Sequence, residues 1–407
     1  MATELNTGNT AWMMVATALV IFMSIPGLAL FYGGLDRAKN MLNTIFMVLT
    51  GFGIASLTWF IVGYSIAYGT DIGGFIGNPL DYLFGKSIGG LTNNGYPVSV
   101  DLLFQLTFAA ITVAIISGSL VGRMKLSAWL LFAFLWSILV YPVIAHWVWG
   151  GGFLSREGEL DFAGGTVVHI NSGLAGLIAA LILGGRKEKF LLPNNVPLVV
   201  LGAGILFFGW FGFNAGSALA ADQIAGWAML NTALATVSAM LTWSVLEILH
   251  FKKPTLVGLA TGIVLGLVII TPAAGFVNPV GAILMGILGT PPAFYAVIKL
   301  KQKLSYDDAL DAFGIHGVGG IAGAILTGVF ADPSINGSAG LLYGNAEQVL
   351  VQIMGVIATV IYSGIATAVI MYVVKLLTGG AKVSEEKEIE GLNKVLHGEK
   401  AYNEITS

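Results

Sequence analysis

The sequence predicts an all-α polytopic membrane protein with eleven transmembrane helices, and three observations support this fold class. The 407 residues are 56% hydrophobic and only 10% charged, whereas soluble domains carry about 25% charged residues. Apolar stretches close to the ~20 residues that cross a bilayer recur along the chain. Two of these stretches share one residue pattern at a constant offset, which indicates an internal repeat.

Eleven apolar stretches are candidates for membrane crossings. Residues 1–9 contain Glu4 but no Lys or Arg, so the first stretch is expected to be a retained helix rather than a signal peptide. The last stretch is long enough to require a strong tilt. The predicted spans are 10–31, 42–65, 100–121, 127–147, 164–184, 198–219, 225–249, 256–273, 278–298, 312–331 and 346–376.

The basic residues predict the orientation of these spans. With eleven crossings, all but two of the 19 Lys and Arg residues fall on one side, the exceptions being Lys86 and Arg156. The positive-inside rule then places the N-terminus outside and the C-terminus in the cytoplasm. We expect a membrane domain over residues 1–376 and a cytoplasmic regulatory tail over 377–407, in the cell (cytoplasmic) membrane.

The repeat centres on two histidines within apolar stretches. His169 lies eight residues after Asp161, and His316 lies eight residues after Asp308, at an offset of 147 residues. The predicted halves, about 10–184 and 198–331, each contain five helices, so eleven crossings make them inverted relative to each other. Eight helical residues rise ~12 Å, close to half of a ~30 Å core. Both imidazoles should therefore lie near the bilayer centre.

Histidine is rare inside membranes and is usually retained there for a function. An imidazole offers a donor and an acceptor near neutral pH, which suits proton handling. A metal site is the alternative, but no third ligand follows at helical spacing and cysteine is absent, so no metal or cofactor is expected. Asp161 could cap its helix or supply a fixed negative charge. Asp308 and Asp311 are assigned a structural role as caps.

Aromatic residues gather at the predicted outer helix ends, including Phe108, Trp147, Trp149 and the segment 210–217. They could belong to the interfacial aromatic belt. Alternatively, a cluster that faces a vestibule could bind a small cation through cation–π contacts. The motifs GxSxG and HExxH do not occur, and the sequence does not predict an enzyme. The net charge of −3 gives no reason to expect a nucleic-acid partner.

Segments along essentially the whole chain resemble the ammonium transporter family (Amt/Mep/Rh), in its prokaryotic Amt type. The matching segments, in order, are 31–34 with Lys39 and Asn40, 105–112, 146–150, 161–169, 210–217, 311–320, 390–393 and 397–402. The resemblance implies a homotrimer of eleven-helix protomers in membrane lipid, each with a narrow pore for ammonium or ammonia.

The resemblance also implies roles for single residues at the outer end of the pore. Trp149, Phe108 and Ser217 would form the outer cation site, and the Ser217 oxygen would accept an N–H hydrogen bond. Asp161 would belong to this site as the residue that stabilises it and its helix without touching the substrate.

Below the outer site, the resemblance implies a gate and a polar pair. Phe108 and Phe213 would be stacked rings that close the pore. His169 and His316 would be the paired pore histidines, and Trp210 would line the pore beside them.

The cytoplasmic segments suggest regulation and also depart from the family pattern. Family members are commonly blocked by a trimeric PII signalling protein, which the resemblance offers as a partner. Asn393 stands where the tail motif usually has aspartate, and Asp36 adds an acidic residue to a loop. Two alternatives stay open beside transport of ammonium. The chain could be an ammonium sensor read by a cytoplasmic partner, or it could carry another small amine or carbon dioxide.

Overall fold

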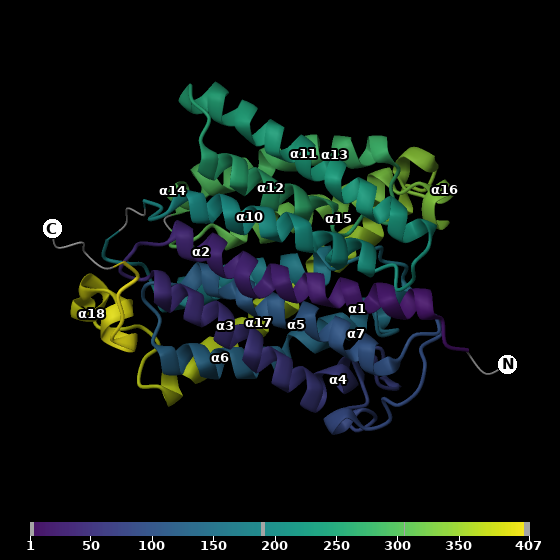
Figure 1. The fold of residues 1–407 in the computed structure, drawn as a ribbon, viewed down its shortest axis with the longest axis horizontal. Helices are drawn as coiled ribbons and strands as arrows, with labels where there is room; N and C mark the ends of the chain where they lie inside the picture. Colours follow the sequence, from purple (N-terminus) through teal and green to yellow (C-terminus); the bar gives the residue numbers. More distant parts are fainter. Residues whose placement is uncertain (1–3, 189–191, 305, 403–407) are drawn as a thin grey trace.

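The computed structural model describes residues 4–188, 192–304 and 306–402, and these residues form a bundle of long helices (Figure 1). Lys189, one of the basic residues used for the orientation, and the end of the tail at 403–407 lie outside the described residues. The α-helices are α1 (Thr7–Phe22), α2 (Ala29–Leu35), α3 (Met41–Thr58), α4 (Tyr64–Tyr68), α5 (Val98–Leu120), α6 (Leu126–Leu139), α7 (Tyr141–Val148), α8 (Phe153–Arg156), α9 (Asn171–Leu183), α10 (Val196–Trp210), α11 (Gln223–Phe251), α12 (Leu256–Ile270), α13 (Pro279–Tyr295), α14 (Lys301–Leu304), α15 (Gly319–Phe330), α16 (Pro333–Asn336), α17 (Glu347–Leu377) and α18 (Glu385–Glu390).

Several α-helices join through π-helical turns into longer continuous helices. Pro26 lies inside the first of these turns, where the missing proline N–H interrupts the regular ladder of α-helical hydrogen bonds. The π-helical turns are η1 (Met23–Leu28), η2 (Trp59–Gly63), η4 (Gly165–Ile170), η5 (Phe211–Ala215), η6 (Ala296–Leu300), η7 (Phe313–Val318) and η9 (Asn393–His397), with single 3₁₀ turns at η3 (Leu83–Gly85) and η8 (Leu341–Tyr343).

Within the described residues, ten continuous helices are long and apolar enough to cross a membrane. They coincide with ten of the predicted spans within a few residues. Two of them, Leu126–Arg156 and Pro279–Leu304, extend further at their C-terminal ends than the predicted spans 127–147 and 278–298. The remaining predicted span, 256–273, contains the apolar helix α12, which is only 15 residues long. The prediction of a helical multi-pass membrane protein is confirmed, whereas eleven crossings and their orientation stay predictions.

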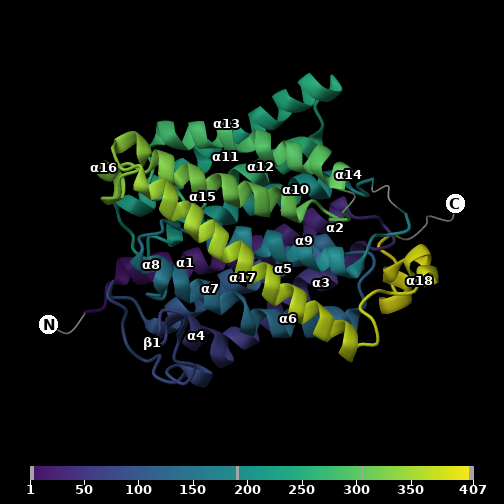
Figure 2. The ribbon, with the colours of Figure 1, turned by 180° about the vertical axis from the view of Figure 1, so that it is seen from behind.

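Two features of the bundle agree with the predicted topology. The start of α1 and the short helix α18 lie at opposite ends of the bundle, as an odd number of crossings requires (Figure 1). Helix α17 has 31 residues and is therefore about 46 Å long, well over a ~30 Å core. Figure 2 shows that α17 runs diagonally across the other helices, which accommodates its length.

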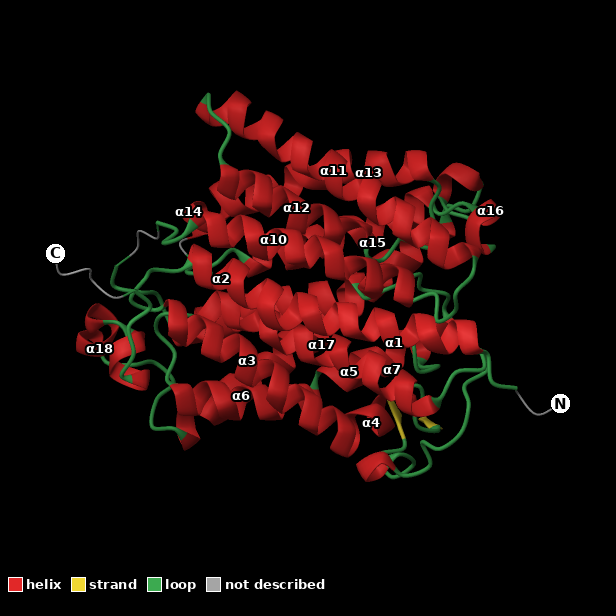
Figure 3. Ribbon diagram, viewed as in Figure 1, coloured by secondary structure: helices red, strands yellow, loops and turns green. Residues whose placement is uncertain are grey.

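Strand structure among the described residues is confined to one hairpin at the end of the bundle that holds the start of α1 (Figure 3). Strands β1 (Asp71–Ile72) and β2 (Ile76–Gly77) pair antiparallel, with Asp71 opposite Gly77 and Ile72 opposite Ile76. The hairpin follows α4 and packs against α7.

The two histidine segments cross each other with repeat-equivalent contacts. A Cβ atom at Gly173 would overlap the backbone of Gly317, and a Cβ at Gly320 would lie 3.1 Å from the backbone nitrogen of Ile170. Each pair is related to the other by the 147-residue offset. The close backbone approach explains the small residues after each histidine, and it agrees with a repeat, although the inverted relation of whole five-helix units stays a prediction.

The two repeat-related aspartates cap the two π-helical turns in the same way. Asp161 accepts from the backbone N–H groups of residues 164–167 at the start of η4. Asp308 accepts from Ala312 and Phe313 at the start of η7. The expected structural role of Asp308 agrees with this geometry, whereas Asp311 forms an ion pair with Lys301 at 2.7 Å.

The C-terminal tail packs on the helix ends that the predicted orientation places in the cytoplasm, and it does so through Asn393, the residue that departs from the family pattern. The Asn393 amide oxygen accepts from the backbone N–H groups of Leu42 and Asn43 at the start of α3, and its Nδ2 donates to Ala38. Asn393 therefore caps α3 with the acceptor that an aspartate would provide. Asp36 is buried and accepts from the Thr44 hydroxyl.

Candidate functional site

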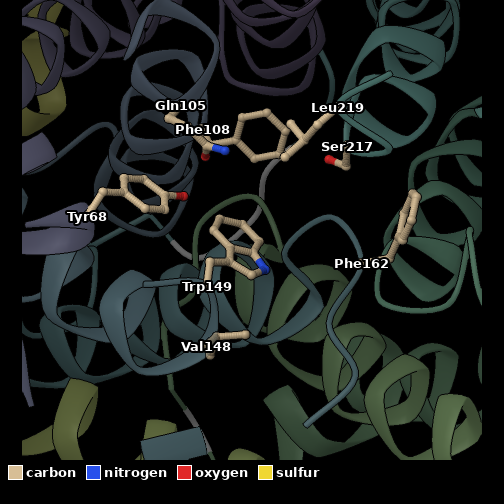
Figure 4. Close-up of a pocket in the computed structure, with 8 residues that line it drawn as sticks. All are labelled: Tyr68, Gln105, Phe108, Val148, Trp149, Phe162, Ser217 and Leu219. Carbon is tan, nitrogen blue, oxygen red and sulfur yellow. The ribbon is translucent and has the colours of Figure 1, made fainter. Parts of the chain in front are cut away.

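A cavity of about 300 Å³ lies beside Tyr68, the last residue of α4, which is followed by the β hairpin. Three of the residues predicted for the outer cation site, Trp149, Phe108 and Ser217, line it together although they come from separate helices. Figure 4 shows the side chains around this cavity. Its lining consists of Tyr68, Gln105, Phe108, Val148, Trp149, Phe162, Ser217 and Leu219.

The position of Trp149 in this cavity is held from two sides. Its indole N–H donates to the backbone carbonyl of Asp161 at 2.8 Å, and its ring meets Phe108 edge-on at 6.0 Å between centroids. The Asp161 carboxylate is buried and bonded to four backbone N–H groups, so it does not line the cavity. The backbone carbonyl of Asp161 therefore orients Trp149, and its carboxylate caps the start of η4.

Ser217 presents an acceptor to the cavity. Ser217 lies in the turn that follows η5, and its hydroxyl donates its single proton to the Phe213 carbonyl at 2.8 Å. The lone pairs of the Ser217 oxygen are therefore available to a donor in the cavity. A cation with N–H groups fits this arrangement better than a bare metal ion of the same charge, because its donors are directional.

A second buried carboxyl group lies next to the Asp161 cap. Glu159 accepts from the Thr166 hydroxyl at 2.6 Å and is almost fully buried. Burial, followed by the nearby negative charge of Asp161, raises the pKa of Glu159 to about 8. At neutral pH Glu159 is therefore mostly protonated, and the carboxylate charge at this helix start is that of Asp161.

The loop beside the cavity is held by His146, which is fully buried on α7. Its Nδ1 lies 2.8 Å from the Ala67 carbonyl and its Nε2 lies 2.8 Å from Asp71. Arg156 donates to the other oxygen of Asp71 at 2.6 Å. The hydrogen bond from His146, followed by that from Arg156, lowers the pKa of Asp71. This network ties α4 and the β hairpin to the helix that ends at Trp149.

Phe108, which lines the cavity, stacks on a second phenyl ring, that of Phe213. Phe108 and Phe213 are stacked with 4.2 Å between centroids and 19° between planes. Phe108 and Phe213 are 1% and 0% exposed, so both rings are buried. The structure therefore brings together the two rings that the resemblance implied as a gate.

The two repeat histidines meet directly beneath the phenyl rings. The Nδ1 atoms of His169 and His316 lie 3.1 Å apart, and the rings are nearly parallel with 5.2 Å between centroids. Trp210 stacks on His169 at 5.4 Å, and its indole N–H donates to Thr271 at 2.9 Å. The 6.0 Å separation of His169 and Phe213 completes a continuous column of rings from the cavity inward.

The hydrogen bond between the histidines restricts their protonation. Only one proton can lie between the two Nδ1 atoms, so one ring donates through Nδ1 and the other accepts. In a neutral pair, the donor ring has a bare Nε2 and the acceptor ring carries Nε2–H. The Nε2 atom of His169 is buried and has no hydrogen-bond partner among the described residues. This ring nitrogen could therefore still form a hydrogen bond with a ligand.

The sequence missed some of the lining and the local geometry. Tyr68 and Phe162 also line the cavity, and Gln105 lies one helical turn before Phe108, a spacing that could have indicated it. Phe213 and both histidines lie in π-helical turns, which often occur at functional sites. Among the described residues, no group of three or more His, Asp or Glu side chains could hold a metal ion.

A cavity, a column of stacked rings and a buried imidazole pair inside a bundle of apolar helices are features typical of a membrane transporter. The model of the Ammonium Transporter Family matches residues 11–402, and the chain belongs to this family. The family is one of transporters, in agreement with the prediction that the chain is not an enzyme.

Individual proteins resemble this chain over nearly its whole length. It is 65% identical to an ammonium transporter of Aquifex aeolicus over 98% of this chain and 94% of that protein. The crystal structure of Saccharomyces cerevisiae Mep2 superposes with a TM-score of 0.90 at 34% identity, covering 100% of this chain and 93% of that chain. A structure titled "Sensor Amt Protein" has a TM-score of 0.89 at 30% identity, covering 96% and 98%.

Proposed function

We propose that this protein carries ammonium across the cytoplasmic membrane by binding the cation at an outer aromatic site and passing ammonia along a hydrophobic pore. The observation that carries the proposal is the continuous column from Trp149 through the Phe108–Phe213 stack to the His169–His316 pair. Each ring lies within about 6 Å of the next, so a small substrate that enters the cavity meets these groups in succession.

Selectivity follows from the chemistry of the outer site and the pore. Ammonium and potassium carry the same charge, so attraction to the Trp149 ring alone does not separate them. Ammonium also donates a hydrogen bond to the Ser217 oxygen, which potassium cannot do. An ion that loses its water shell between the buried Phe108 and Phe213 rings pays a large desolvation penalty. Neutral ammonia avoids most of this penalty after the proton leaves.

The histidine pair supports the passage of ammonia and the handling of its proton. One Nε2 of the neutral pair accepts a hydrogen bond from ammonia, and the other donates to its lone pair. The pair thereby replaces hydrogen bonds that the substrate loses on leaving water. Because each ring can exchange donor and acceptor roles with its neighbour, the pair also provides a path for a proton.

The test is transport by the purified protein in liposomes, measured as current after pulses of ammonium or potassium chloride. We expect a sustained current with ammonium and none with potassium, and Trp149→Leu should raise the half-saturating ammonium concentration about tenfold, since a desolvated cation–π contact contributes up to about 2 kcal/mol. Trp227→Leu, on α11 and outside the cavity, is the matched control.

Absence of current has two distinct meanings, which a pH-sensitive dye inside the liposomes separates. Alkalinisation of the lumen after an ammonium pulse would mean that neutral ammonia is conducted without net charge. No current and no alkalinisation would refute transport and favour the ammonium-sensor alternative. A structure titled "Sensor Amt Protein" shares this fold, so the fold alone does not separate the two functions.

The proposal extends to assembly and regulation. We propose a homotrimer embedded in membrane lipid, supported by the exposed apolar side chains of α11, α13 and α17, which need lipid or a neighbouring protomer as cover. A PII-family protein is proposed to bind the cytoplasmic face, where residues 377–402 form the described part of the regulatory tail. Native mass spectrometry and a pull-down with PII protein test these two points, and a monomer or no capture would refute them.

A further inference from the structure

The outer cavity is lined by two polar side chains that the proposed cation site does not use, Gln105 and Tyr68. Tyr68 lines the cavity together with Trp149, Phe108 and Ser217. Its hydroxyl oxygen is buried and has no hydrogen-bond partner among the residues that the structure describes. Buried hydroxyl groups are nearly always hydrogen-bonded, because an unmade bond is unfavourable. The Tyr68 hydroxyl therefore has an unused acceptor and donor at the wall of the cavity.

The orientation of Tyr68 is determined by its neighbours. Its ring packs edge-on against Trp59 with 6.2 Å between centroids and lies 5.2 Å from the Tyr64 ring. The preceding residue, Ala67, is anchored through its carbonyl to the buried His146 ring. In Figure 4 the hydroxyls of Tyr68 and Ser217 point toward the middle of the cavity from opposite sides, with Trp149 between them.

We propose that the Tyr68 hydroxyl is a further ligand of the substrate cation at the outer site, and that it contributes to the choice of ammonium over methylated amines. This inference rests on the proposed function of the cavity. The phenol oxygen accepts one N–H bond of the cation while the Ser217 oxygen, whose own proton is committed to Phe213, accepts another. The faces of Trp149 and Phe108 supply the non-directional attraction.

Two fixed acceptors on opposite walls discriminate by the number of N–H groups that a cation can direct at them. Ammonium has four equivalent N–H groups and satisfies both acceptors in several orientations. Methylammonium has three N–H groups and must also place its methyl group within a cavity of about 300 Å³ that other rings share. Removing the Tyr68 oxygen should therefore weaken ammonium binding more than methylammonium binding.

The experiment compares Tyr68→Phe with the wild-type protein in liposomes, with currents recorded over a range of ammonium and methylammonium concentrations. The half-saturating ammonium concentration should rise about three- to tenfold, the size expected when one hydrogen bond to a charged donor is lost and water partly replaces it. The methylammonium value should change less than half as much. Circular dichroism and gel filtration verify that the variant is folded.

Tyr141→Phe is the matched control. Tyr141 also has a buried hydroxyl without a partner, and it packs against the same Trp59 ring at 5.6 Å, but it does not line the cavity. It should leave both half-saturating concentrations unchanged. If Tyr68→Phe changes neither value, or changes both by the same factor, the hydroxyl is not a direct ligand and the inference is wrong.

A third variant separates this inference from the proposed function. Ser217→Ala removes the acceptor on which the proposed outer site depends. An effect of Ser217→Ala without an effect of Tyr68→Phe would overturn the inference about Tyr68 alone. A wild-type protein that carries neither cation would instead overturn the proposed function itself.

Discussion

The hydrogen bond between His169 and His316 leads to a prediction that single and double substitutions distinguish. Replacing either histidine with phenylalanine keeps an aromatic ring at its position but leaves the Nδ1 atom of the other histidine without the partner that it has in the pair. Both side chains are buried, at 0% and 3% exposure. A buried polar group that loses its partner destabilises a protein by about 1–3 kcal/mol.

The double variant should be less destabilised than the sum of the two single variants. When both rings become phenylalanine, no unpaired Nδ1 atom remains, and replacing both partners with apolar groups of similar shape is close to neutral. Because each single variant loses about 1–3 kcal/mol and the double variant close to none, the coupling free energy of the cycle should have a magnitude of about 2–6 kcal/mol. The measurement is denaturant unfolding of the purified protein in detergent, followed by tryptophan fluorescence. Additive effects of the two substitutions would refute the hydrogen bond as the source of the coupling.

The same variants test the role of the pair in transport. Because His169 and His316 lie at the inner end of the ring column, with the rings of Trp210 and Phe213 beside His169, their loss should change ammonium-over-potassium selectivity or proton coupling more than it changes folding. Liposome currents on ammonium and potassium pulses, together with lumenal pH, measure both properties. If the two single variants and the double variant keep the wild-type selectivity and the wild-type ratio of charge to ammonia transported, the proposed pore is contradicted.

Two further predictions concern groups outside the pore. Asn393→Leu removes the acceptor that caps Leu42 and Asn43, so the tail should loosen by about 1 kcal/mol, whereas Asn393→Asp should retain the cap. Limited proteolysis of the tail measures this, and equal protection of Asn393→Leu and wild type would contradict it. Burial raises the pKa of Glu159 from 4.5 to about 8, with Asp161 adding to the shift. The folded protein then holds a proton that the unfolded chain releases, so the wild-type free energy of unfolding should fall by about 1.4 kcal/mol per pH unit between 4.5 and 8. Glu159→Gln should remove this fall, and parallel stability curves of the two proteins between pH 5 and 8 would rule the explanation out.

The positions of the helices could be predicted from the sequence because lipid imposes a simple rule. Every backbone N–H and C=O in hydrocarbon must be hydrogen-bonded within the protein, so a long apolar stretch becomes a helix almost regardless of its neighbours. The predicted span 164–184 therefore corresponds to Gly165–Leu183, and 346–376 to Glu347–Leu377. The predicted span 256–273 corresponds only to the shorter helix α12, which ends at Ile270 and is followed by irregular turns before α13.

The residues of the site could be named from the sequence only in part. The repeat offset indicated His169 and His316, and the resemblance implied Trp149, Phe108 and Ser217. Neither source indicated Tyr68, because a tyrosine at the end of an apolar span is typical of the interfacial belt. Its hydroxyl becomes informative only when its missing hydrogen-bond partner and its place in the cavity wall are known.

The sequence by itself determined that this chain is a helical membrane protein of the ammonium transporter family with two equivalent buried histidines. Hydropathy and residue identity are local properties, and they persist whatever the packing. Only the tertiary structure decided that the Nδ1 atoms of the two histidines lie 3.1 Å apart. It also decided that the Asp161 carboxylate accepts backbone N–H groups, and that Asn393 binds the tail to the start of α3. These features depend on side chains from distant segments meeting at hydrogen-bond distance, and such meetings arise from the packing of helices rather than from the order of residues along any one of them.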